Sequence, residues 1–301
     1  MRATLVLWAA AWAAGAAAVV WTQAVVDPHT VPPNIYGLLN QLAAIADATY
    51  CITETSRIRQ PYQCNKCDTE GLELVYQWFT YHADCGYVAI STDAEQEEVV
   101  IALRGTHSLG DGVQDIKADL IKCRWCDHCQ VHRGFWQYFE ATVARVNPVV
   151  MAYIRQGRRL RIIGHSLGGA VAILLGGYYT RLGIDPTVVT FGAPRLGNAQ
   201  LNEWVYSSLG LWFPVCHKHD PVPTVPQPYA PFNWQVFIDT EPNELPPPQD
   251  KVYWCNGCID DTFQHPLHQP MVIQPHLEYF RTLGLCQWQV PSPPTITVTI
   301  S

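Results

Sequence analysis

The segment Gly164-His165-Ser166-Leu167-Gly168-Gly169 constrains the fold of this chain more than any other feature. Its Gly-x-Ser-x-Gly spacing places a serine on a sharp turn between a strand and a helix, where the flanking residues must be small because the two elements approach closely. Residues 159–163 resemble a short strand, and residues 170–179 are small and apolar, as in a helix packed on a sheet. The segment predicts a strand–turn–helix unit with Ser166 as a candidate nucleophile.

The rest of the chain alternates between strand-like and helical patterns. After Pro33, apolar residues at Leu38, Leu42 and Ile45 recur at helical spacing and predict a helix that ends near Tyr50. Further helical patterns cover 135–155 and 169–181, and strand-like runs cover 86–91, 99–103, 160–163, 188–191, 211–215 and 234–238. This alternation predicts an α/β fold with a mostly parallel central sheet and helices on both faces.

Length and charge limit the organisation and the partners. With 301 residues, 48% of them hydrophobic, the chain is expected to form one catalytic domain over residues 30–286 and a tail over residues 287–301. The formal net charge is −7 and only 15% of residues are charged, so no basic stripe exists to attract nucleic acid. No obligate protein partner is evident.

The N-terminus resembles a secretory signal peptide. Arg2 precedes an uncharged run over residues 5–20, and small-x-small cleavage patterns follow, which predicts a signal over about residues 1–24 and an extracellular protein. The alternative is an uncleaved membrane anchor, because no charged residue occurs between Arg2 and Asp27.

The chain contains 11 cysteines. In a cytosolic protein, the spacing Cys123-x-x-Cys126-x-x-Cys129-x-x-His132 would indicate a metal site, and an inactive zinc-binding module is one alternative for the whole chain. A signal peptide favours disulfides instead. The odd count leaves at least one thiol unpaired within the chain. Three short bridges are expected, and Cys85, Cys123 and Cys216 are left unassigned; the bridges are Cys64–Cys67, Cys126–Cys129 and Cys255–Cys258.

A serine nucleophile needs a base and a carboxylate that orients it. In α/β-hydrolase sheets these partners follow the serine in the order Asp or Glu, then His. Asp220 follows a predicted strand and precedes a proline, so it is the preferred carboxylate. Three later histidines, His265, His268 and His276, are candidates for the base, and position alone does not separate them.

Four ordered motifs together resemble the class 3 lipase family, the fungal triacylglycerol lipases, over about residues 32–286. They are residues 164–169, residues 191–198 (Phe-Gly-Ala-Pro-Arg-Leu-Gly-Asn), His217-x-x-Asp220, and residues 276–280 (His-Leu-Glu-Tyr-Phe). The resemblance implies an α/β-hydrolase fold and cleavage of a lipid or other ester, foremost an acylglycerol, with no cofactor or metal. It also implies that His276 is the base, that Thr106 and Leu167 form the oxyanion hole through their backbone N–H groups, and that Cys51 pairs with Cys286.

The segment after Thr106 departs from the family pattern. The resemblance implies a lid over about residues 107–119, in which Leu109, Val113, Ile116 and Leu120 would share one helical face. Two glycines weaken that helix, and the tryptophan common in the family's lid is missing. Thr106 and the stretch over residues 126–134 are also similar to the feruloyl esterases of the same fold. A feruloyl-type or other soluble ester is therefore the alternative substrate.

Overall fold

A nine-stranded sheet forms the centre of the molecule, with strand order β1-β11-β10-β9-β8-β7-β4-β3-β2. The computed structural model describes residues 29–80, 85–106, 119–259, 273–284 and 286; the predicted signal peptide, most of the predicted lid, His265, His268 and the tail lie outside them. The strands of this sheet are β1 (His29–Thr30), β2 (Leu72–Phe79), β3 (Cys85–Ser91), β4 (Glu98–Leu103), β7 (Arg159–His165), β8 (Thr187–Phe191), β9 (Leu211–His217), β10 (Trp234–Ile238) and β11 (Val252–Asn256).

The five central strands, β4, β7, β8, β9 and β10, pair in parallel, and the strands on both sides of them pair antiparallel. This confirms the α/β architecture expected from the sequence. Because the central strands are parallel, their carboxyl ends meet at one edge of the sheet. Ser166 directly follows β7, and Asp220 lies three residues after β9, so both occupy that edge.

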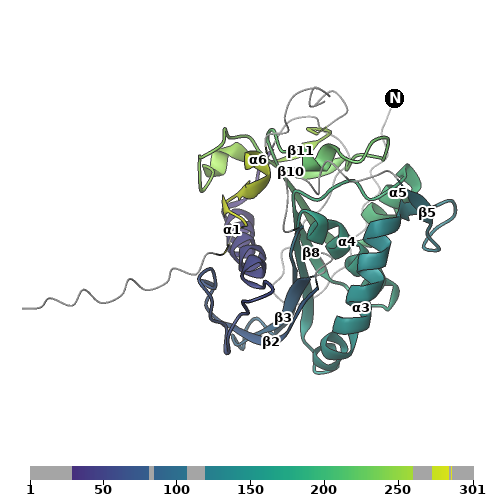
Figure 1. Cartoon of the computed structure of the whole chain (residues 1–301). Helices are drawn as coiled ribbons and strands as arrows, with labels where there is room; N and C mark the ends of the chain where they lie inside the picture. Colours follow the sequence, from purple (N-terminus) through teal and green to yellow (C-terminus); the bar gives the residue numbers. More distant parts are fainter. Residues whose placement is uncertain (1–28, 81–84, 107–118, 260–272, 285, 287–301) are drawn as a thin grey trace, which may run out of the picture.

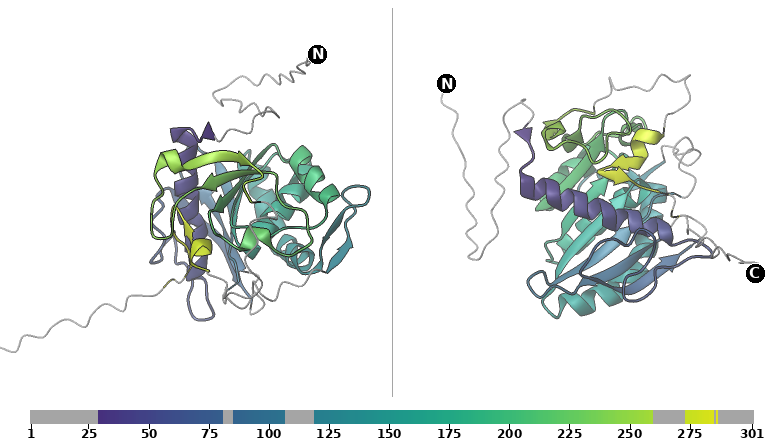
Figure 2. Two further views of the ribbon diagram at one scale, coloured as in Figure 1. Left: turned by 90° about the horizontal axis from the view of Figure 1, so that it is seen from above. Right: turned by 90° about the vertical axis from the view of Figure 1, so that its left-hand side faces the viewer.

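Helices cover both faces of the sheet (Figure 1). Helix α1 (Pro33–Ala48) lies on one face, and α3 (Arg133–Ile154), α4 (Leu167–Arg181) and α5 (Ala199–Ser208) lie on the other. Figure 2 shows α1 running across its face of the sheet. Each layer has its own apolar cluster: α1 packs with Ile163 and Phe191, and α3 and α4 pack with Ile162 and Val188. The alternation of side chains along each strand divides the apolar residues between these two cores.

Several helices and strands were not predicted from the sequence, and the expected helical position of Leu120 is wrong. Strands β2 and β11 and helix α5 lacked a clear periodic signal. Leu120 was expected on the helical face of the lid, but it begins strand β5 (Leu120–Lys122), which forms a hairpin with β6 (Gln130–His132). The hairpin holds Leu120 opposite His132, so this residue cannot continue a lid helix.

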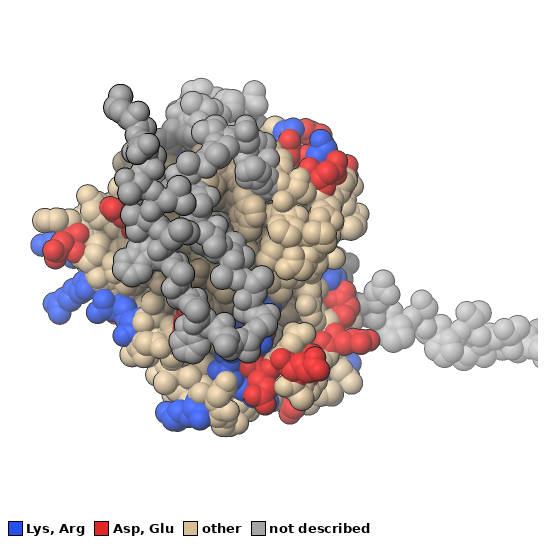
Figure 3. Space-filling model, turned by 180° about the vertical axis from the view of Figure 1, so that it is seen from behind, with Lys and Arg blue, Asp and Glu red and all other residues tan. Residues whose placement is uncertain are grey.

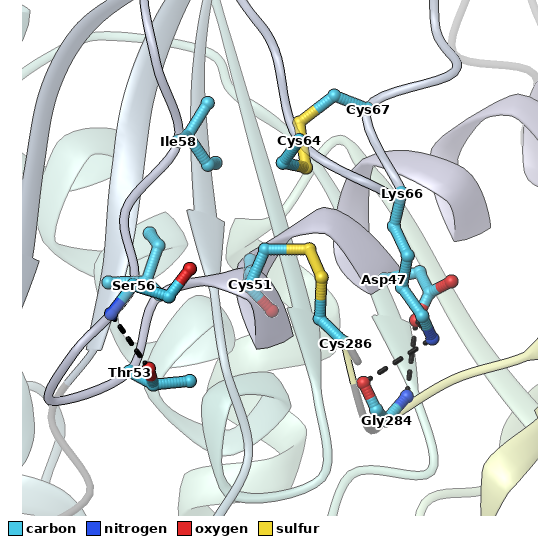
Figure 4. The surroundings of a disulfide bond; sticks show 12 residues. Asp47, Cys51, Thr53, Ser56, Ile58, Cys64, Lys66, Cys67, Gly284 and Cys286 are labelled. Carbon is cyan, nitrogen blue, oxygen red and sulfur yellow. Dashed lines mark hydrogen bonds and ion pairs between the residues drawn. A yellow bond between two sulfur atoms is a disulfide. The ribbon is translucent and has the colours of Figure 1, made fainter. Parts of the chain in front are cut away.

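The end of α1 is tied to the C-terminal segment of the domain (Figure 4). Cys51, in the short helix η1 (Thr49–Cys51), forms a disulfide with Cys286. Beside it, the buried carboxylate of Asp47 accepts hydrogen bonds from Lys66 Nζ at 2.6 Å and from the Gly284 amide at 3.1 Å, and Arg281 Nε lies 3.2 Å away. The segment 281–286 follows the candidate base His276, so these contacts fix the chain just beyond it.

Breaking this disulfide is expected to destabilise the protein. Its cysteines are 235 positions apart, and a cross-link over so long a loop restricts the unfolded chain strongly. The double variant Cys51→Ser/Cys286→Ser should lose about 2 to 5 kcal/mol of unfolding free energy in a urea titration. Cys64→Ser/Cys67→Ser is the matched control, because that bridge closes a separation of only three. An equal loss in both variants would contradict the loop-length explanation.

Charged side chains are sparse and grouped on the face of the molecule seen from behind (Figure 3). In this view most Lys and Arg lie toward the left and lower left, and most Asp and Glu lie toward the right and lower right. A mixed group of both signs lies at the upper right, and uncharged areas separate these groups. Within the described ranges, no helix is long and apolar enough to cross a membrane.

Candidate active site

Ser166 lies on the predicted sharp turn between β7 and α4. Its backbone has φ 57° and ψ −129°, a strained left-handed conformation for a residue with a side chain. The Ser166 amide donates to the Phe191 carbonyl at 2.9 Å, which ties the turn to the end of the neighbouring strand β8. A backbone strained in this way, and held by surrounding structure, is typical of a nucleophile elbow.

The two glycines of the motif are required by close approach. A methyl group at Gly164 would lie 2.1 Å from the Gly168 carbonyl oxygen, and one at Gly168 would lie 2.5 Å from the Leu103 carbonyl oxygen. Both distances are far shorter than atomic contact allows. The spacing of the motif therefore follows from the packing of β7 against the first turn of α4 and the end of β4.

The structure brings Asp220 and His276 together at the same edge of the sheet. His276 Nδ1 lies 3.0 Å from Asp220 Oδ1 and 2.9 Å from Asp220 Oδ2, and both side chains are fully buried. Helix α6 (Gln274–Leu277) carries His276, and the loop after β9 carries Asp220. A carboxylate at this distance fixes the tautomer of the imidazole, with the proton on Nδ1 and a lone pair on Nε2.

Further donors satisfy the buried Asp220 carboxylate. The Val222 amide donates to Oδ1 at 2.8 Å, and the hydroxyl of Tyr279 donates to Oδ2. Tyr279 belongs to strand β12 (Glu278–Tyr279), which pairs with β13 (Arg281–Thr282). Burial, followed by the charge of Asp220, raises the pKa of Tyr279 well above its usual value, so the phenol keeps its proton. A protonated phenol and an ionised carboxylate form a charge-assisted hydrogen bond.

The loop that carries Asp220 is held by a buried arginine. Arg195, from the Phe-Gly-Ala-Pro-Arg motif, is fully buried and donates from Nη1 to the Tyr229 carbonyl at 2.9 Å and from Nε to the Pro223 carbonyl at 3.3 Å. The Arg195 amide also donates to the Val225 carbonyl at 2.8 Å. This arginine therefore has a structural role: it anchors the proline-rich chain that follows the carboxylate.

His276 Nε2 is buried and, within the described part of the chain, makes no hydrogen bond, so the structure does not join it to Ser166 Oγ. The two residues are nevertheless neighbours through His165: the His165 and His276 rings stack with their centroids 4.6 Å apart, and His165 directly precedes Ser166. Catalytic hydrogen bonds in ligand-free enzymes are often long and tighten on substrate binding.

The two proposed oxyanion donors come from different elements. Leu167 is the first residue of α4, where the helix itself provides no acceptor for the amide. Thr106 follows Gly105, whose backbone packs against Ser166: a methyl group at Gly105 would lie 2.7 Å from Ser166 Cβ. The preceding residue, Arg104, is buried and donates from Nη1 to the Ile52 carbonyl at 2.6 Å, which anchors the loop.

The remaining singled-out histidines have local roles. His132 accepts from the Phe135 amide at 3.2 Å and caps α3. His217 Nδ1 lies 2.6 Å from the Lys218 carbonyl oxygen, and its Nε2 lies 3.2 Å from Thr240 Oγ1. His165 contacts both Tyr50 and His276. Tyr50 was not selected from the sequence, and Tyr279 appeared there only as part of the motif over residues 276–280, without a role. The one signal that the sequence offered for His165 is its position inside the Gly-x-Ser-x-Gly motif, directly before Ser166.

Eight cysteines form disulfides in the structure, and three do not. Besides Cys51–Cys286, the disulfides are Cys64–Cys67, Cys126–Cys129 and Cys255–Cys258. Cys85, Cys123 and Cys216 are buried and form no disulfide, and burial raises the pKa of Cys123 and Cys216. Two members of the zinc-like spacing are thus joined as a disulfide, and the described residues contain no cluster suited to a metal ion.

The buried histidines predict loss of stability in mild acid. Burial is the main cause that lowers the pKa of His165 well below its usual value, and the neighbouring His276 lowers it further. Burial also lowers the pKa of His217. As the pH falls, the histidines of the unfolded chain are protonated before those of the folded chain. The unfolding free energy is therefore at its highest above about pH 6.5 and decreases below that pH. The slope should reach about 1.4 kcal/mol per pH unit for each histidine until its folded-state pKa is passed.

Urea titrations between pH 7.5 and 5.5 measure this slope. His165→Gln should flatten it, because this variant removes one of the two buried histidines whose pKa is lowered. Stability that stays constant over this range would show that the buried histidines do not resist protonation.

Comparisons with known proteins agree with this fold. A family model described as lipase (class 3) matches residues 100–230. The secreted mono- and diacylglycerol lipase 2 of Gibberella zeae is 28% identical over 289 residues, covering 78% of this chain and 69% of that protein. The secreted mono- and diacylglycerol lipase 1 of Fusarium solani is 26% identical over 250 residues, covering 80% and 74%.

Among solved structures, the nonglycosylated LIP2 lipase of Yarrowia lipolytica aligns with a TM-score of 0.78 and 29% identity, covering 87% of this chain and 99% of the lipase. This similarity covers most of both chains. Together with the matched motifs, it establishes the resemblance inferred from the sequence. The resemblance of this chain to the class 3 lipase family is thereby confirmed, with the family model matching residues 100–230.

Proposed function

We propose that this protein is a secreted acylglycerol lipase in which Ser166, Asp220 and His276 form the catalytic triad. The observation that carries the proposal is the contact between two fully buried side chains, with His276 Nδ1 2.9 Å from Asp220 Oδ2 at the sheet edge where Ser166 lies on its strained turn. A buried imidazole paired with a carboxylate, at the same sheet edge as a serine on a strand-to-helix turn, is suited to acyl transfer.

The chemistry follows from the roles of these atoms. His276 Nε2 takes the proton of Ser166 Oγ as the oxygen attacks the ester carbonyl carbon, and Asp220 stabilises the imidazolium that results. The backbone N–H groups of Thr106 and Leu167 stabilise the negative charge on the carbonyl oxygen. His276 then returns the proton to the leaving alkoxide, which departs as the alcohol. Water, activated by the same imidazole, hydrolyses the acyl-enzyme and releases the carboxylic acid.

The proposed substrate class rests on the relatives. The matched proteins from Gibberella zeae and Fusarium solani are named secreted mono- and diacylglycerol lipases, which supports partial acylglycerols as substrates and an extracellular location. We further propose that residues 1–24 are a signal peptide, that residues 30–286 form the catalytic domain and that residues 287–301 form a tail. N-terminal sequencing of the exported protein tests the signal: the mature chain should begin near residue 25.

A substrate panel tests the function. Purified protein is assayed on emulsions of monoacylglycerol, diacylglycerol and triacylglycerol and on methyl ferulate, with release of acid followed by titration at constant pH. Turnover of one or more acylglycerols, well above that of methyl ferulate, is expected. Preferential cleavage of methyl ferulate would replace the lipase with a feruloyl esterase and leave the triad untouched.

A further inference from the structure

We propose that Tyr50 and His165 are positioning residues for the reaction. Their buried hydroxyl and buried imidazole together hold two segments in place beside Ser166: the backbone of His276, and the oxyanion loop, which is the loop of residues 104–106 that carries the proposed donor Thr106. The proposal rests on the serine mechanism given above. It assigns a role to two side chains that take no part in the chemistry itself.

The hydrogen-bond donors around His165 can be deduced from its partners. The His165 side chain is fully buried, with Nε2 2.8 Å from the carbonyl oxygen of His276 and Nδ1 hydrogen-bonded to the hydroxyl of Tyr50. A carbonyl oxygen only accepts, so His165 Nε2 carries the proton. Nδ1 then holds a lone pair and accepts from the Tyr50 hydroxyl. Both ring nitrogens are satisfied by a single neutral tautomer.

The Tyr50 hydroxyl also contacts the oxyanion loop. Gly105, the residue before Thr106, packs directly against it. A methyl group at Gly105 would lie 2.8 Å from Tyr50 Oη and 2.7 Å from Ser166 Cβ, so the Gly105 backbone is packed between these two residues. One hydroxyl therefore connects the loop that bears an oxyanion donor to the histidine that holds the His276 backbone.

The charge state of His165 matters because its ring stacks on that of His276, with centroids 4.6 Å apart and planes 29° apart. The titratable groups that face His165 are Tyr50 from η1, His276 from α6 and Tyr279 from β12. Burial raises the pKa of both tyrosines, so neither supplies an anion. A protonated His165 would oppose the positive charge that His276 carries in the transition state, and its Nδ1 could no longer accept from Tyr50.

Four variants separate positioning from stability. Tyr50→Phe removes the shared hydroxyl, His165→Phe removes both ring hydrogen bonds, and His165→Gln keeps a side chain that can both donate and accept. Tyr62→Phe is the matched control, because it also deletes a buried tyrosine hydroxyl, which bonds Tyr87 Oη at 2.6 Å in another part of the α1 core. Each variant is assayed for kcat and KM on p-nitrophenyl butyrate, for thermal unfolding, and for the rate of labelling by a p-nitrophenyl phosphonate.

We expect kcat to fall about 10- to 100-fold in Tyr50→Phe and His165→Phe, with KM changing less than about threefold, because small misplacements of catalytic groups cost rates of this order. His165→Gln should recover at least part of the loss. Tyr62→Phe should lower the unfolding temperature as much as Tyr50→Phe does but keep the wild-type kcat. The phosphonate labelling rate should fall in parallel with kcat.

Two results overturn the proposal while leaving the serine mechanism intact: wild-type kcat and labelling rate in Tyr50→Phe, or equal losses of kcat in Tyr50→Phe and Tyr62→Phe. A wild-type protein that the phosphonate does not label, although it cleaves the ester, removes the serine mechanism and the positioning role together. The labelling measurement thus distinguishes the two failures.

Discussion

Replacing Ser166 with alanine is expected to lower kcat/KM for acylglycerols by on the order of 10⁵- to 10⁶-fold, the scale measured for removal of a serine nucleophile. No other hydroxyl is held on the turn between β7 and α4. Without the Ser166 hydroxyl, no acyl-enzyme can form, even though His276 is still present as a base. The alanine methyl group replaces the Ser166 side chain without new bulk, so the fold should be retained. The assay is acid release from a diacylglycerol emulsion, with circular dichroism as the check on folding.

Ser207→Ala is the matched control for this prediction. Ser207 is an exposed residue near the end of α5, and its hydroxyl donates to the Trp204 carbonyl at 2.9 Å. This variant should keep wild-type activity. If Ser166→Ala retained even 1% of the wild-type kcat/KM, Ser166 would not be the nucleophile.

The second large effect is expected from Asp220→Asn, which should lower kcat by about 10⁴-fold with a small change in KM. The amide oxygen can still accept from the Val222 amide at the position of Oδ1, so the loop should keep its shape. The amide nitrogen would then face His276 Nδ1 and favour the tautomer with its lone pair on Nδ1. In that tautomer Nε2 carries a proton and cannot accept one from Ser166.

Asp239→Asn is the control for the carboxylate. Asp239 forms a half-exposed ion pair with Lys218 Nζ at 3.1 Å, and exposed pairs contribute at most about 1 kcal/mol to stability. Its kcat should equal that of the wild type. An Asp220→Asn variant with more than a tenth of wild-type kcat would mean that another group orients the base.

Much of the central fold follows from local sequence. The run before Ser166, the strand at 234–238 and the helix after Pro33 are each encoded by patterns that depend on neighbouring residues, and the structure has these elements within a few positions of the expected ranges. Strand β2, at an edge of the sheet, alternates only weakly between buried and exposed residues, and α5 exposes much of its surface. Their patterns resemble those of loops, so local sequence does not identify them.

The site was predictable to the extent that chemistry limits the choice of residues. The elbow spacing identified Ser166, and position after a strand favoured Asp220, but only the family resemblance separated His276 from the two other late histidines. The contacts of Tyr279 with Asp220, and of Tyr50 with His165, join residues 59 and 115 positions apart. Contacts over such separations depend on the folded topology. Tyr279 lies in the motif over residues 276–280, but the sequence does not show that it bonds Asp220, and nothing in the sequence marks Tyr50 as a partner of His165.

The most direct test of the central claim, an acyl-enzyme on Ser166 assisted by His276, is to locate the residue that a mechanism-based reagent labels. The wild-type protein is treated with p-nitrophenyl hexylphosphonate, digested and analysed by peptide mass spectrometry. We predict one adduct per chain, on the peptide that contains Ser166, formed together with complete loss of lipase activity, and no adduct in Ser166→Ala. An adduct on any other residue, or full activity after stoichiometric labelling, would contradict the account.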